Sequence, residues 1–220
     1  MDDAYILRHV DHTLLKATAS WQEIQQLCAD AVKYNTASVC VPPYYVRRIH
    51  EAFPGLNICT VIGFPLGYDC SKAKAIASQV AIADGANELD MVINITDVKN
   101  GAFDFIGAEI ISLKGIAGSR ILKVIVEACY LTEQEKIALC ETVTYAGADY
   151  IKTSTGFGTG GATMEDVLLF KEHIGPNVKI KAAGGIRTRE DMVAFLEAGC
   201  SRLGTSSAVS LLGGGKADGY

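Results

Sequence analysis

The sequence lacks the features that mark membrane, secreted and nucleic-acid-binding proteins. No apolar run approaches the ~20 residues that a membrane helix needs. The first five residues, Met1 to Tyr5, have neither the basic segment nor the apolar core of a signal peptide. The formal net charge is -5 with both signs interspersed, so the chain has no basic footprint for nucleic acid. We expect a cytoplasmic protein that binds neither nucleic acid nor a membrane.

Patterns for disulfides and metal ions are also missing. The seven cysteines are odd in number, scattered and never spaced C-x-x-C, which fits reduced thiols better than a disulfide frame or a zinc site. Of the four histidines, only His9 and His12 lie close together, and their offset of three puts them on opposite faces of a strand. We therefore expect no metal centre. Cys40 falls on the inward face of its strand, either near a pocket or as a buried spectator thiol.

What the chain does have is a high apolar content in a regular order. Its 220 residues are 49% hydrophobic, and the mean hydropathy is +0.21, which suits a parallel sheet buried on both faces. Strand-like and helix-like segments alternate eight times, with no linker or low-complexity break. The fold class that this order predicts is a single α/β domain over residues 1–220, a (β/α)8 TIM barrel with a flexible tail at about 213–220. A doubly wound open sheet is the rival, but no G-x-G-x-x-G follows the first strand.

The expected elements can be placed from local patterns. Capping boxes at Ser20 with Glu23 and at Thr132 with Glu135 each open a helix, and Thr188 caps a third. Apolar residues at helical spacing predict further helices over 72–83, 103–116 and 164–173. Short β-like runs predict strands over 37–41, 58–62, 88–94, 121–127, 150–153 and 178–182.

Charges inside the predicted strands point toward a site. Side chains alternate across a strand, and the uniformly apolar faces should pack against the outer helices. Asp90, Lys123, Lys152 and Lys181 then turn into the barrel from four successive strands. Taken alone, Lys152 could be a rim lysine that extends to water. Four ionisable side chains that converge at the carboxyl ends of barrel strands indicate an active site instead. A lysine held there as a neutral amine is a nucleophile for a carbonyl carbon.

Glycine-rich loops after the last three strands supply a second signal. Glycine lets backbone N–H groups approach an anion, and loops at these positions of a barrel often hold phosphate. Each loop alone would read as an ordinary turn. Beside a lysine cluster, the three loops predict a phosphorylated small substrate bound by Thr155, Gly156, Gly184, Gly185, Ile186, Gly204, Ser206 and Ser207.

Several of these segments together resemble the deoxyribose-phosphate aldolase family. The match runs essentially from end to end, spacing included, and is carried by residues 11–15 (DHTLL), 61–67 (VIGFPLG), 88–94 (ELDMVIN), 122–127 (LKVIVE), 150–156 (YIKTSTG) and 178–188 (VKIKAAGGIRT). Two positions depart from the pattern. Phe157 stands where some members carry a phosphate-binding lysine, and Ala182 stands where some carry proline.

The resemblance implies a class I aldolase without metal or other cofactor, acting in nucleoside catabolism. It would reversibly cleave 2-deoxy-D-ribose 5-phosphate to acetaldehyde and D-glyceraldehyde 3-phosphate. Lys152 matches the Schiff-base lysine, and Lys181 matches a second lysine whose positive charge lowers the pKa of Lys152. Asp90 matches the carboxylate that moves protons, and Tyr220 a terminal tyrosine that folds over the site.

Other residues receive supporting roles. Asp11 matches a carboxylate that supports the two lysines, although it could equally cap local N–H groups at a strand end. Lys123 and Glu127 would orient groups and balance charge, and Lys179 would be structural, deeper in the barrel or at its lower rim. The family also suggests a homo-oligomer.

Two rival functions remain open on the sequence alone. One is another phosphate-binding barrel enzyme, such as a sugar-phosphate isomerase or a different class I aldolase. The other is a sugar-phosphate-binding barrel without catalytic activity.

Overall fold

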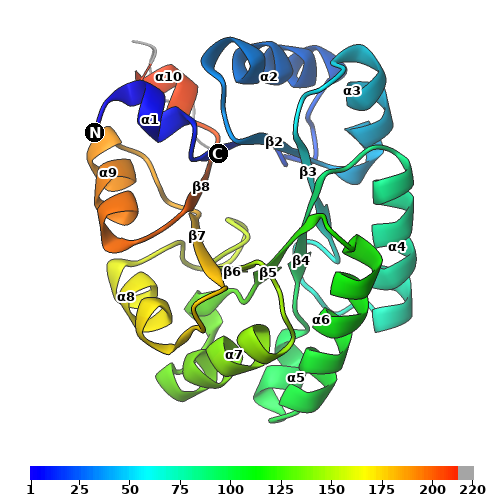
Figure 1. Cartoon of the computed structure of the whole chain (residues 1–220), viewed down its shortest axis with the longest axis vertical. Helices are drawn as coiled ribbons and strands as arrows, with labels where there is room; N and C mark the ends of the chain where they lie inside the picture. Colours follow the sequence, from blue (N-terminus) through cyan, green and yellow to red (C-terminus); the bar gives the residue numbers. More distant parts are fainter. Residues whose placement is uncertain (213–220) are drawn as a thin grey trace.

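Eight parallel strands close into a barrel inside a ring of helices (Figure 1). The computed structural model describes residues 1–212, and Tyr220 and the expected flexible tail from 213 lie outside them. Each strand pairs with its sequence neighbours, and β1 pairs with β8 to complete the circle. The strands are β1 (Val10–Thr13), β2 (Ser38–Val41), β3 (Ile58–Ile62), β4 (Glu88–Val92), β5 (Ile121–Ile125), β6 (Tyr150–Lys152), β7 (Lys179–Ala183) and β8 (Arg202–Thr205). The predicted TIM barrel is confirmed.

A helix follows every strand on the outside of the barrel. These helices are α2 (Trp21–Tyr34), α3 (Val46–Ala52), α4 (Ser71–Ala83), α6 (Phe103–Ala117), α7 (Glu133–Tyr145), α8 (Met164–His173), α9 (Arg189–Ala198) and α10 (Ala208–Leu212). Short additions are α1 (Asp3–Leu7), α5 (Ile95–Lys99) and two single 3₁₀ turns, η1 (Pro43–Tyr45) and η2 (Ala128–Tyr130). In Figure 1, α1 and α10 lie side by side. None of the helices within residues 1–212 is long and apolar enough to cross a membrane.

The local signals that predicted helices act as expected. The side chains of Ser20 and Thr132 each accept a hydrogen bond from the backbone N–H three residues on. The side chains of Glu23 and Glu135 in turn accept one from the backbone N–H of Ser20 and Thr132. Thr188 forms a third capping box with Asp191. Each box satisfies N–H groups that a helix start would otherwise leave unpaired, which explains where these helices begin.

The main apolar core lies between the barrel and the helices. Outward-facing strand residues such as Leu89, Met91, Leu122 and Val124 are fully buried in it. A second, smaller cluster lies inside the barrel and consists of Leu15, Cys40, Cys59 and Val61, with Phe64 packed against it. The alternation read from the sequence therefore separates the two faces correctly.

One strand boundary changes the placement of a site residue. The sequence predicts a strand through residue 127, which would turn Glu127 into the barrel beside Lys123. In the structure β5 ends at Ile125, and Glu127 adopts a left-handed backbone with φ 51° at the start of η2. That turn redirects the Glu127 carboxylate toward the loop after β6, so this part of the prediction is wrong.

Candidate active site

Two lysines on neighbouring strands share one carboxylate oxygen. Lys152 and Lys181 are paired in register on β6 and β7. Their amines lie 2.8 and 2.6 Å from the same Oδ2 of Asp90, which reaches across from β4. Lys181 and Asp90 are completely buried, and Lys152 is 3% exposed. The strand register thus delivers the three residues that the sequence placed at the centre of the site.

Beneath this trio, a second layer of charges completes the barrel interior. The guanidinium of Arg202 lies 2.5 Å from Asp11 and 3.2 Å from Glu88, while the Lys123 amine lies 2.7 Å from Asp90 and 2.5 Å from Glu88. Lys181 also donates to Asp11. Asp11 is therefore an ion-pair partner of the second lysine, and its supporting role in the reaction stays a prediction. Three carboxylates face four basic side chains, so one amine can be neutral without leaving a carboxylate unpaired.

The mutual proximity of these groups sets their charge states. Burial by itself would raise the pKa of Asp90, but Lys123, Lys152 and Lys181 outweigh that effect and hold the pKa well below its usual range. Burial alone would likewise raise the pKa of Asp11. Lys123, Lys181 and Arg202 outweigh burial and lower this pKa below its usual value. For Lys181, burial opposes the charge, yet Asp11 and Asp90 raise its pKa above the usual value. At neutral pH both aspartates are ionised and Lys181 is a cation.

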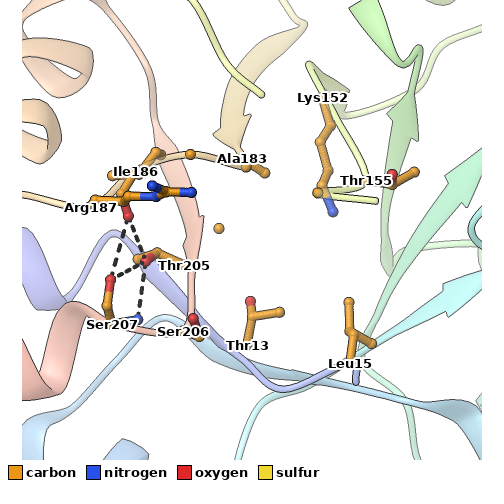
Figure 2. A pocket seen from close by; sticks show the side chains of 14 residues that line it. Thr13, Leu15, Lys152, Thr155, Ala183, Ile186, Arg187, Thr205, Ser206 and Ser207 are labelled. Carbon is orange, nitrogen blue, oxygen red and sulfur yellow. Dashed lines mark hydrogen bonds between the residues drawn. The ribbon is translucent and has the colours of Figure 1, made fainter. Parts of the chain in front are cut away.

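A pocket opens directly above the lysine pair at the carboxyl ends of the strands. Figure 2 shows the Lys152 side chain on one side of it and Arg187 and Ser207 on the other. All eight residues predicted to bind phosphate line this pocket, together with Lys152, Thr13, Leu15, Ala183, Arg187 and Thr205. The loops after β6, β7 and β8 therefore converge where the sequence placed them.

Glycine is required at two of these positions for different reasons. Gly184 has φ +80°, a conformation that other residues rarely adopt. A Cβ on Gly204 would lie 2.9 Å from the Cβ of Ala183 and 3.1 Å from Cε of Lys181. A side chain at Gly204 would therefore displace the second lysine from the barrel axis.

The redirected Glu127 fixes the loop that follows Lys152. Its carboxylate accepts the backbone N–H of Thr155 at 3.0 Å and also the Thr155 hydroxyl. The Thr155 hydroxyl oxygen in turn accepts the N–H of Phe157 at 3.0 Å. Burial raises the pKa of Glu127, although the two bonds from Thr155 and the charge of Lys152 act in the opposite direction. Glu127 therefore orients the pocket loop and does not take part in the buried charge cluster.

Comparisons with known proteins agree with this geometry. The family described as "DeoC/LacD family aldolase" matches residues 5–212. The chain belongs to this aldolase family. It is 62% identical to a deoxyribose-phosphate aldolase of Clostridium botulinum (strain Alaska E43 / Type E3) over 100% of both chains, and 56% identical to that of Clostridioides difficile (strain 630), over 94% of this chain and 95% of the relative.

Solved structures give the same result. A putative deoxyribose-phosphate aldolase from Coccidioides immitis superposes with a TM-score of 0.93 at 38% identity, covering 97% of this chain and 87% of the other. A deoxyribose phosphate aldolase from Aeropyrum pernix, described as having a unique tetrameric structure, has a TM-score of 0.88 at 30% identity and covers 96% of this chain and 91% of its own. Membership of this family makes the chain an aldolase, which is a carbon–carbon lyase.

Three charged residues of this aldolase were not found from the sequence. Glu88 shares the inward face of β4 with Asp90, and Arg202 lies directly beside Lys181 in the β7–β8 register. The alternation that identified Asp90 and Lys181 could have identified both. Arg187 follows the Gly184–Gly185 turn, where only the folded loop shows that it lines the pocket. Lys179 is exposed at the start of β7 with its amine 5.8 Å from the Tyr150 ring, which agrees with a structural role at the lower rim.

Within residues 1–212, two sets of side chains lie close enough to hold a metal ion. They are Cys40 with Cys59 and Asp90, and Asp11 with Cys59 and Glu88. No sequence pattern indicates either set, because the members come from different strands and follow no spacing motif. The carboxylates of both sets accept hydrogen bonds from lysine or arginine, so an ion at either set would have to displace a basic side chain.

Proposed function

We propose that this aldolase reversibly cleaves 2-deoxy-D-ribose 5-phosphate to acetaldehyde and D-glyceraldehyde 3-phosphate through a Schiff base on Lys152. The observation that carries the proposal is the position of the Lys152 amine. It opens onto the glycine-lined pocket while it rests 2.8 Å from an aspartate oxygen that a second lysine also contacts.

The reaction begins with the neutral Lys152 amine, which attacks the aldehyde carbon of the open-chain sugar. Loss of water from the resulting carbinolamine gives a protonated imine. This imine accepts the electron pair of the C2–C3 bond as the C3 hydroxyl loses its proton, and glyceraldehyde 3-phosphate leaves. The enamine that remains on Lys152 is protonated at C2, and water then hydrolyses the iminium to acetaldehyde and the free amine.

Asp90 and Lys181 supply the proton transfers and the electrostatics. Asp90 is ionised and touches Lys152, so it can take a proton from the amine and return it, directly or through a water. The positive charge of Lys181 lies on the same carboxylate oxygen as the Lys152 amine, and Asp11 contacts Lys181 there. Tyr220, which lies outside the described residues, is proposed to assist proton transfer.

The phosphate of the substrate is assigned to the far side of the pocket from Lys152. The loops after β7 and β8 bring Gly184, Gly185, Ser206 and Ser207 to the pocket, and Gly204 lines it from β8, so backbone N–H and hydroxyl groups are available to an anion. Arg187 adds a positive charge on the same side. A sugar phosphate anchored there extends its aldehyde toward the Lys152 amine.

The wider setting follows from the same assignment. We infer a cytoplasmic enzyme of nucleoside catabolism, working with reduced thiols and without a cofactor. A homo-oligomer is supported by the tetramer described for the Aeropyrum pernix relative. The mass of the native protein in solution, measured by light scattering on a gel-filtration column, tests the oligomer directly.

Trapping the intermediate tests the mechanism. The protein is incubated with acetaldehyde, reduced with borohydride and mapped by mass spectrometry of its peptides. We expect one ethyl adduct, on Lys152, and none on the exposed Lys179. A Lys152→Met variant should give no adduct, whereas a matched Lys179→Met variant should label like the wild type. An adduct on another lysine, or none at all, would overturn the assignment of Lys152.

A further inference from the structure

Two cysteines face each other across the β2–β3 ladder inside the barrel. Cys40 and Cys59 are partners in the strand register, and both are completely buried. The thiol of Cys59 lies 3.1 Å from Oδ1 of Asp90. The two sulfur atoms and one carboxylate oxygen of Asp90 all lie within 4.8 Å of one another. The aldol mechanism uses neither thiol.

We propose that Cys40, Cys59 and Asp90 form an inhibitory site for a soft divalent cation such as Zn²⁺ or Cd²⁺. In a tetrahedral zinc site with Zn–S bonds of about 2.3 Å, the two sulfur atoms are about 3.8 Å apart. Side-chain rotation can bring the three ligand atoms to such distances without moving the strands. Water supplies the fourth ligand.

The charge balance of the barrel interior permits this ion despite the nearby lysines. When a divalent ion binds, both thiols lose their protons, so two positive charges enter and two leave. No electron is transferred. Thiolates are the ligands that soft ions prefer, and the net charge beside Lys123 and Lys181 does not change.

The second set of close ligands, Asp11 with Cys59 and Glu88, is the weaker candidate. It offers one thiolate, so a bound ion would leave one extra positive charge in the cluster. Both of its carboxylates also contact Arg202, whose guanidinium cannot give up a proton. The dithiol set therefore suits a soft ion better.

Binding at the dithiol set would stop the enzyme through Asp90. An ion bound at Oδ1 of Asp90 would displace the Lys123 amine, which lies 2.7 Å from that oxygen and 3.2 Å from the Cys59 sulfur. Lys152 and Lys181 contact the other oxygen, Oδ2, so the ion would draw charge from the carboxylate that they share and make it a poorer proton acceptor. Binding itself does not depend on the proposed reaction, whereas the inhibition rests on it.

The test is a cadmium titration of the full chain in a Cys70→Ser/Cys129→Ser background, which removes the two cysteines that are not buried. Four quantities are measured together: bound cadmium by equilibrium dialysis, the ultraviolet absorption of cadmium thiolate, protons released into weak buffer, and aldol cleavage. We expect one ion and about two protons per chain. Activity should fall with the same midpoint as binding, and EDTA should restore it.

Single substitutions then identify the ligands. Cys59→Ala and Cys40→Ala should each weaken cadmium binding by at least about tenfold. Cys40→Ser and Cys59→Ser serve the same purpose if an alanine variant fails to fold, as judged by its circular dichroism. Tight binding that survives loss of Cys40 with one proton released would assign the ion to the Asp11 set and overturn the proposal.

Other outcomes are equally decisive. Binding that is unaffected by loss of Cys59 would exclude both sets, and no binding by the starting protein would exclude a site altogether. Full binding without loss of activity would overturn the inhibitory role. If the protein proves to have no aldolase activity, the dialysis, absorption and proton measurements still report on the site, so the two failures are distinguishable.

Discussion

Within residues 1–212, buried lysines occur in two regions, and their surroundings differ. Between α4 and α6, outside the barrel, Lys74 is 1% exposed and lies 2.8 Å from Glu109. Its amine also donates to the Val92 carbonyl at 2.9 Å, and Ser71 bonds the other oxygen of Glu109 at 2.8 Å. This is one cation with one anion, and both side chains are buried. Inside the barrel, a single oxygen of Asp90 accepts hydrogen bonds from both Lys152 and Lys181.

The comparison shows that burial alone does not identify a reactive lysine. Lys74 and Lys152 are almost equally buried, but only Lys152 lines a pocket and shares its carboxylate with another cation. A closed pair stabilises the charged form of both partners. A shared carboxylate leaves one amine that can be neutral and can meet a substrate, which is the condition for nucleophilic attack.

The outer pair nevertheless supports the site. The Val92 carbonyl that Lys74 holds is two residues beyond Asp90 on β4. The Lys74 chain also runs beneath Gly63, where an added Cβ would lie 2.8 Å from Cε of the lysine. The role of Lys74 is thus structural. The same substitution should mainly lower stability at Lys74 and mainly lower the rate at Lys152.

Lys152→Met tests the reactive half of this comparison and has the largest expected effect. Removal of the nucleophile should lower kcat for cleavage of deoxyribose 5-phosphate by at least about four orders of magnitude. Lys74→Met, assayed at a temperature where it is folded, should retain kcat within about threefold, because Lys74 does not touch the pocket. Initial rates in a coupled assay measure both. A large loss of kcat in folded Lys74→Met would contradict the distinction.

Lys74→Met tests the structural half through the free energy of unfolding. Removing one partner of a buried ion pair leaves Glu109 without its counterion, which typically costs about 3–5 kcal/mol. Urea unfolding followed by circular dichroism measures the loss. The matched control is the double variant Lys74→Met/Glu109→Met, which removes both charges and should recover most of the stability. If the double variant is as unstable as the single one, packing and not charge explains the effect.

The steepest loss of stability at acid pH should come from the aspartates inside the barrel. Asp11 and Asp90 have folded-state pKa values far below the unfolded value of about 3.9. Their stabilisation is complete above the unfolded pKa and is lost as the pH falls below it, because the unfolded chain then binds more protons. Burial lowers the pKa of His12 to about 4, so urea midpoints should already fall between about pH 6.5 and pH 4, and more steeply from about pH 4 to pH 3 as the two aspartates contribute. Asp11→Asn should flatten the steep part, and an unchanged slope would contradict this source.

The sequence predicts the charged residues inside the barrel but not the Lys74–Glu109 pair outside it. The alternation of strand residues placed Asp90, Lys123, Lys152 and Lys181 inside because a side chain two positions on must return to the same face. The same rule applies to Glu88 and Arg202. Their pairing across 114 residues of sequence, however, depends on barrel closure, which brings β8 and β4 to a common interior.

The parts that could not be predicted depend on where strands end. Glu127 continues the β5 pattern in sequence, yet the β5–β6 ladder stops where Ile125 meets Lys152, and the chain turns. Lys74 sits on a helix whose sequence shows no partner, since Glu109 lies 35 residues away on α6. The Cys40–Cys59 contact is likewise a property of strand register and not of any motif. Long-range register is the information that local patterns do not contain.

Replacing Phe157 with lysine at the mouth of the pocket has the smallest expected effect, a change in the preference for the phosphorylated sugar. Phe157 follows the pocket-lining Gly156, is 46% exposed, and packs edge-on against Phe64 with ring centroids 5.3 Å apart. Phe157→Lys would place an exposed cation near the assigned phosphate position. Because an exposed charge pair contributes at most about 1 kcal/mol, the preference for deoxyribose 5-phosphate over deoxyribose should rise by about fivefold.

The measurement is the ratio of kcat/KM for the two sugars, with Phe157→Met as the uncharged control of similar length. The lysine should act mainly through KM of the phosphorylated sugar, because it binds a part of the substrate that does not react. Its effect should shrink as salt is raised, since an exposed charge is screened. An unchanged ratio would mean that the phosphate lies out of reach of this loop. A fall in kcat for both sugars would mean instead that the Phe64–Phe157 contact positions the Lys152 loop, an influence on rate that the buried Lys74 pair is not expected to have.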